Sequence, residues 1–100
     1  MPLFTVRKEL YEWIKEGKKT IEVRKGAASR GEIAVFQSGR RNLRFRIAKK
    51  ETGALREVIR LENYKQVIPI AENVEEALTY FRKLYGTDLG LFTAYYVSIQ

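Results

Sequence analysis

Short stretches in which apolar and polar residues alternate recur along the chain, and this alternation limits the folds available to it. A period of two is typical of β-strands that bury one face. The pattern predicts strands over residues 3–6, 20–24, 32–37, 42–48, 55–61 and 91–99. We expect residues 42–61 to form a long hairpin, because the segment Glu51-Thr52-Gly53 between its two strands has the composition of a turn.

Helical periodicity is evident in two segments, near residues 8–16 and 74–85. In the second, Asn73 and Glu76 have the spacing of a capping box, and Gly86 stands where a helix would end. Two helices are too few to cover both faces of a parallel sheet. We therefore expect an α+β, mainly β fold: a small mixed barrel, mostly antiparallel and closed or nearly closed, with about five to six strands and two short flanking helices.

The composition excludes several kinds of chemistry. With 100 residues, the chain is expected to form a single domain spanning residues 1–100. It contains no cysteine and no histidine, which removes disulfides, thiolate nucleophiles and nearly every catalytic zinc or iron site. We expect no metal and no cofactor, and any catalysis would depend on lysine, arginine, acidic or hydroxyl side chains.

Positive charge is concentrated in the first half of the chain. Residues 1–50 carry 14 basic and 5 acidic side chains, whereas residues 51–100 carry 5 basic and 7 acidic ones. The segment 40–50 alone holds six basic residues and no acidic one. Within it, Arg44 and Arg46 are expected to share the outer face of a strand and to contact phosphates. This asymmetry favours RNA as a partner, with a plain solvated basic surface as the alternative.

The chain gives no sign of a membrane segment or an export signal. No apolar run approaches the roughly 20 residues of a membrane span. Residues 1–6 lead directly into charged residues, without the apolar stretch and cleavage site of a signal peptide. We expect a cytoplasmic monomer with no membrane partner.

The segment Gly17 to Arg24 is denser than any other in side chains that could bind a ligand or take part in catalysis. Alternation along its strand places Glu22 and Arg24 on one face, with Lys19 at the strand's entrance. Two cations beside a carboxylate suit a ligand with phosphate or carbonyl oxygens and a polar hydrogen. Arg7, at the end of the first strand, is a further candidate for the same cleft. The alternative is a solvated ion pair on a strand, which would contribute little.

These residues also resemble a known family. Gly17, Lys19, Glu22 and Arg24 match the Gly-x-Lys-x-x-Glu-x-Arg signature of the ASCH (activating-signal-cointegrator homology) domain. The resemblance extends to the preceding strand and helix, and to the last helix and strand. It implies a PUA-like β-barrel whose cleft is lined by the motif's Lys, Glu and Arg and binds RNA or nucleotides.

The resemblance also implies an alternative activity. Some small ASCH proteins are amidohydrolases that act on N4-acetylcytidine through a Lys, a Thr and a distant Glu. The Lys matches Lys19, the candidate catalytic residue, whereas Glu22 occupies the position of the Thr and is a candidate general base. Loose candidates for the distant acid are Glu72, Glu75 and Glu76. A protein–protein adaptor without a cleft is the third possibility.

Overall fold

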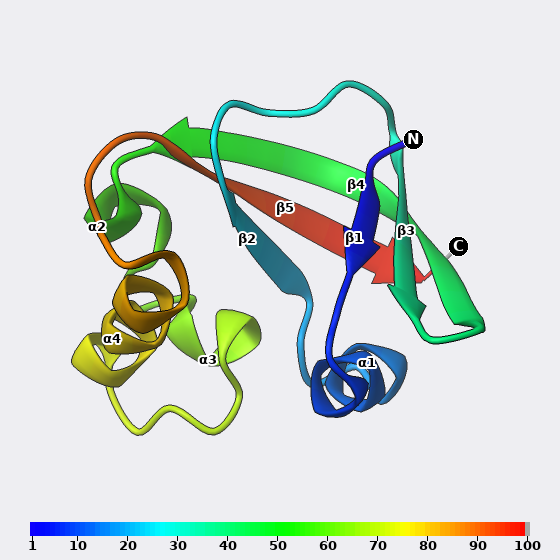
Figure 1. The fold of residues 1–100 in the computed structure, drawn as a ribbon, viewed down its shortest axis with the longest axis horizontal. Helices are drawn as coiled ribbons and strands as arrows, with labels where there is room; N and C mark the ends of the chain where they lie inside the picture. Colours follow the sequence, from blue (N-terminus) through cyan, green and yellow to red (C-terminus); the bar gives the residue numbers. More distant parts are fainter. Residues whose placement is uncertain (100) are drawn as a thin grey trace.

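A computed structural model describes residues 1–99, which form one curled five-stranded sheet with helices packed against it (Figure 1). In chain order the elements are β1 (Leu3–Thr5), α1 (Lys8–Lys15), β2 (Ile21–Lys25), β3 (Ile33–Ser38), β4 (Arg41–Gly53), α2 (Leu55–Val58), α3 (Tyr64–Val67), α4 (Val74–Tyr85) and β5 (Phe92–Ile99). The expected α+β, mainly β architecture is thus confirmed, although the sheet forms a curled half-barrel.

Strand β4 organises the sheet, whose strand order is β1-β3-β4-β5-β2. It pairs antiparallel with β3 along its first half and with β5 along most of its length. Among the strands of residues 1–99, only β1 and β3 run parallel. A register shift between Ile47 and Lys49 interrupts the β4–β5 ladder. Bulges of this kind bend a strand and increase its twist, which lets β4 follow the curl of the sheet.

The two edge strands, β1 and β2, face each other across an open seam. No backbone ladder joins them among the described residues, because β1 pairs with β3 and β2 pairs with β5. A side chain bridges the seam instead: Nη2 of Arg24 on β2 donates a hydrogen bond of 3.0 Å to the carbonyl oxygen of Thr5 on β1. The barrel is therefore left open at the strands that carry the candidate site residues.

Side chains of β5 point alternately into two apolar clusters, so this strand is buried on both faces. Tyr95 and Val97 belong to a cluster covered by α1, together with Phe36 on β3. Phe92 and Ala94 belong to a second cluster, which α2, α3 and α4 cover. Figure 1 shows these three helices grouped on one side, away from α1. The two faces of β5 thus pack against different helices, α1 on one face and α2, α3 and α4 on the other.

Helix α4 begins and ends as the sequence predicts. The side chain of Asn73 accepts a hydrogen bond of 2.9 Å from the backbone N–H of Glu76. The Glu76 carboxylate accepts a hydrogen bond of 2.7 Å from the backbone N–H of Glu72. In a standard capping box the donor would be the N–H of the N-cap residue itself, here Asn73. Gly86 closes the helix at φ 74°, a left-handed conformation that favours glycine.

The strand predicted over 55–61, and with it the hairpin over 42–61, is wrong. Residues Leu55–Val58 form the short helix α2, and the hairpin partner of β4 is β3. Leu55, Val58 and Ile59 are each at most 2% exposed, and their i, i+3, i+4 spacing is that of a helical face. The Glu57 side chain also accepts from the N–H of Ala54 at 2.7 Å, which favours a helical turn.

A second short helix, α3, was not predicted. Tyr64, Val67 and Ile68 repeat the same spacing, and Val67 and Ile68 are buried in the cluster below α4. The described residues therefore contain four helices where the sequence predicts two. Within residues 1–99, no helix combines the length and the apolar character that crossing a membrane requires.

Replacing Asn73 with Ala should lower the free energy of unfolding by about 1 kcal/mol, because the first turn of α4 loses its side-chain cap. Urea denaturation followed by circular dichroism measures this change. Asn42→Ala, at an exposed position of β4, is the control and should change stability by less than about 0.5 kcal/mol. Equal effects of the two substitutions would contradict the capping role.

Candidate functional site

Lys19 lies in the turn between α1 and β2, and its ammonium group is buried. Only 3% of the residue is exposed. Its Nζ donates to the carbonyl oxygens of Ile21 and Val67, both at 2.7 Å, and lies 3.5 Å from Oε1 of Glu22. Burial lowers the pKa of Lys19, and the nearby Glu22 carboxylate opposes that shift. Two carbonyl oxygens thus accept hydrogen bonds from the ammonium, and a third oxygen, from the Glu22 carboxylate, lies at ion-pair distance and balances the buried charge.

Glu22 is held between two cations. It is 5% exposed, and its Oε2 accepts a hydrogen bond of 2.5 Å from Nε of Arg24. Its Oε1 has no hydrogen-bond partner among the described residues and is sealed from solvent. The ion pair with Lys19, at 3.5 Å, is longer than a charge-assisted hydrogen bond. Glu22 therefore serves first to fix the two basic side chains.

The guanidinium of Arg24 is fixed in turn by three neighbours. Besides Glu22, it contacts the Thr5 carbonyl oxygen, and its Cζ lies 5.0 Å from the ring centroid of Phe4. About one third of the side chain, 32%, stays exposed. Arginine in such a stacked and hydrogen-bonded position presents its remaining N–H groups in a fixed direction. Arg24 is therefore the member of this group best placed to meet a ligand.

These charges line a cleft of about 280 Å³ at the open seam. One wall comes from β1, β2 and the residues next to them, and contributes Thr5, Arg7, Lys19, Glu22 and Arg24. The opposite wall is the apolar and aromatic face of α4, with Tyr80, Phe81, Leu84 and Tyr85. Three cations and one carboxylate leave the cleft with a formal excess of positive charge. Such a cleft suits an anionic ligand that also has a flat apolar part.

The structure brings together four of the predicted site residues, namely Arg7, Lys19, Glu22 and Arg24. Arg44 and Arg46 are exposed on the outer face of β4, opposite Val35 and Ile33 of β3, and line none of this cleft.

The candidates for a distant acid also lie outside the cleft. Glu75 pairs with Arg56 and Arg82, and Glu76 caps α4. Within residues 1–99, no group of three or more acidic side chains is arranged to hold a metal ion.

The aromatic wall was missed by the sequence analysis. Tyr80 is half-buried, and burial raises the pKa of its hydroxyl. Its ring lies 5.3 Å from that of Phe81 in an edge-to-face arrangement. Ala77, Tyr80 and Leu84 lie at i, i+3 and i+7, so helical spacing could have placed this tyrosine at the margin of the buried face of α4.

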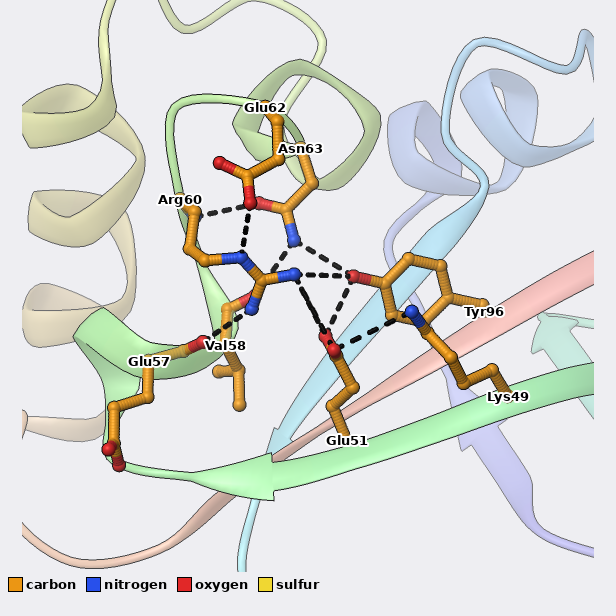
Figure 2. Close-up of polar contacts among 8 residues, drawn as sticks. All are labelled: Lys49, Glu51, Glu57, Val58, Arg60, Glu62, Asn63 and Tyr96. Carbon is orange, nitrogen blue, oxygen red and sulfur yellow. Dashed lines mark hydrogen bonds and ion pairs between the residues drawn. The ribbon is translucent and has the colours of Figure 1, made fainter.

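A polar network away from the cleft positions the segment that holds Lys19 (Figure 2). Asn63, 4% exposed, accepts from the N–H of Arg60 at 2.7 Å and donates to the Val58 carbonyl and the Tyr96 hydroxyl, both at 3.0 Å. The Tyr96 hydroxyl donates to Glu51 on β4 at 2.8 Å. These bonds tie the chain before α3 to the sheet. Helix α3 then supplies the Val67 carbonyl to Lys19.

Lys19→Met should lower the free energy of unfolding by about 3 kcal/mol, because it leaves Glu22 with one cation and two buried carbonyl oxygens without a donor. Lys18→Met is a matched control, since the Lys18 side chain is 63% exposed and pairs only with Glu16. It should change stability by less than about 0.5 kcal/mol. Urea denaturation measures both variants, and equal losses would refute the structural role of Lys19.

The network in Figure 2 predicts a specific pH dependence. Burial alone would raise the pKa of Glu51, but hydrogen bonds from Tyr96 and Arg60 outweigh it and lower the pKa below its ordinary value of 4.5. The stability that this shift supplies is present above pH 4.5 and is lost as the pH falls through the lowered pKa.

Glu51→Gln should therefore have a lower free energy of unfolding than the wild type at pH 7. Between pH 7 and pH 3, its free energy of unfolding should fall by less than that of the wild type. Denaturant titrations at pH 7 and pH 3 compare the two proteins. Glu57→Gln, at an exposed position of α2, is the control. Parallel losses for the wild type and Glu51→Gln would contradict the assignment.

Comparison with known proteins shows which solved structures share this fold. No family model and no curated protein matches this sequence. The hypothetical protein PH0355 superposes with a TM-score of 0.76 at 20% identity, over 96% of this chain and 95% of that one. The solution structure of PF0455 from Pyrococcus furiosus has a TM-score of 0.67 at 23% identity, over 97% and 94%.

The ASCH structure from Zymomonas mobilis matches with a TM-score of 0.63 at 18% identity, over 96% of this chain and 65% of its own length. This agreement covers nearly the whole sheet and its helices. It confirms the architecture that the Gly17–Arg24 signature implied. The protein therefore has the PUA-like fold of an ASCH structure, with five strands curled into a half-barrel that is open between β1 and β2.

Proposed function

We propose that this chain is an ASCH-type domain that binds RNA or a nucleotide in the seam cleft. The observation that carries the proposal is the arrangement of charges in the cleft. The single carboxylate, Glu22, is paired with both Lys19 and Arg24. The cleft therefore keeps an excess of positive charge, and Arg24 and Arg7 are the cations that would contact an anion. A guanidinium binds phosphate oxygens through charge-assisted hydrogen bonds. On the opposite wall, Tyr85 of α4 offers a ring to a base.

The solvent exposure of the site residues favours binding over catalysis. The ammonium of Lys19 faces three oxygen acceptors, and Oε1 of Glu22 is sealed from solvent. A nucleophile or general base must reach the reacting atom. The amidohydrolase alternative would need both groups to leave these partners, and within residues 1–99 no second carboxylate lines the cleft. An adaptor would need a broad apolar surface in place of a charged cleft.

Arg44 and Arg46 have a separate place in this proposal. They lie outside the cleft and are exposed on β4. Contacts from such residues to phosphates add affinity that does not depend on base sequence. We assign them to the backbone of a longer RNA that the cleft holds by one nucleotide.

Arg7→Ala should weaken binding of a fluorescein-labelled ten-nucleotide single-stranded RNA about tenfold at 50 mM salt, because the cleft loses its most exposed cation. Fluorescence anisotropy measures the affinity. Lys15→Ala, at an exposed basic position outside the lining of the cleft, is the matched control and should change the affinity less than about twofold. An RNA affinity that is undetectable in the wild type, or equal in wild type and Arg7→Ala, would refute the proposal.

A further inference from the structure

Arg7 stands where three hollows of the surface meet. It follows β1 and precedes α1, and its side chain is exposed. It lines the seam cleft, a hollow along the outer side of α1 and a shallow groove on α4. A ligand that extends from the cleft past Arg7 therefore meets either the hollow on α1 or the groove on α4.

The path along α1 is acidic. Besides Arg7 and Lys8, the hollow on α1 is lined by Trp13 and by three glutamates: Glu9, Glu12 and Glu16. Glu12 pairs with Arg41 of β4 at 2.6 Å, whereas no ion pair within residues 1–99 neutralises Glu9. Carboxylates near a phosphate are repulsive, so this path disfavours a polyanion.

The path along α4 is basic and partly aromatic. Its groove is lined by Arg7, Tyr80, Lys83 and Leu84 and contains no acidic residue. The three α4 residues lie at i, i+3 and i+4, so one face of the helix presents a ring, an ammonium and an apolar side chain. Tyr80 and Leu84 also line the cleft, which makes the groove its direct continuation.

The two cations of this groove are not used elsewhere in the described part of the chain. The neighbouring Arg82 pairs with Asp88 at 2.9 Å and with Glu75 at 3.7 Å. No ion pair within residues 1–99 involves Lys83 or Arg7, whereas eight other basic residues of this part of the chain are paired. An arginine and a lysine that flank a half-buried ring form a site for a phosphate next to a base that contacts the ring.

We propose that the α4 groove is a second nucleotide subsite, so that the protein holds a short single strand across the cleft and the groove. This inference rests on the proposed function of the cleft. One nucleotide occupies the cleft, the next phosphate lies between Arg7 and Lys83, and the following base lies against Tyr80 and Leu84. The strand is unpaired at this point, because a base in a duplex cannot present its face to a side chain.

The chain length of the ligand tests the second subsite. Isothermal titration at 50 mM salt compares a mononucleotide, a dinucleotide and a trinucleotide of one base type, each with a 5′-phosphate. The trinucleotide should bind the wild type about tenfold more tightly than the mononucleotide, since each added base gains a stacking contact and each phosphate a cation. Lys83→Ala should remove most of this gain and leave mononucleotide affinity unchanged.

The matched control is Lys65→Ala, whose side chain is exposed on α3 and lines neither the cleft nor the groove. It should keep the full gain with length, and Lys83→Arg should restore it. Equal affinities for all three lengths, or a length gain that survives Lys83→Ala, would overturn the second subsite and leave the cleft proposal standing. If the wild type binds none of the three lengths, the proposed function itself is refuted. A glutamate tripeptide that binds as tightly as the trinucleotide would overturn both.

Discussion

The buried ammonium of Lys19 is the interaction on which the rest of the site depends. A charge that is 3% exposed is tolerated only when oxygen acceptors replace the water it has lost. Those acceptors come from three places: β2, the end of α3 and the carboxylate of Glu22. Lys19 thus joins the sheet to the helical layer, and the same contacts fix Glu22 at the base of the cleft.

A series of charged contacts leads from Lys19 through Glu22 and Arg24 across the open seam. Glu22 accepts from Arg24, and Arg24 reaches the Thr5 carbonyl of the opposite edge strand. The side chain takes the place of a missing ladder hydrogen bond, which protects two edges that would otherwise expose unpaired backbone groups. A barrel closed by backbone pairing at this seam would have no room for the cleft. Its openness is therefore what lets a charged motif on a strand meet a ligand.

Much of this arrangement could be predicted from the local spacing of residues in the sequence. The alternation around Glu22 and Arg24 predicted their shared face, and the helical periodicity near residues 8–16 correctly predicted α1. Residues 55–61 were wrongly predicted as a strand, because a run as short as Leu55, Val58 and Ile59 satisfies helical spacing while its β-branched residues favour a strand. The bond from Lys19 to the Val67 carbonyl joins residues 48 apart, a pairing that no local pattern records.

The most direct measurement of the account is a nuclear magnetic resonance titration of the labelled protein with a short single-stranded RNA. Binding at the seam predicts amide shifts confined to β2, the end of β1 and α4, with Glu22, Arg24 and Tyr80 among the most affected. Shifts that instead map to the outer face of β4 around Arg44, with those three residues unchanged, would contradict it.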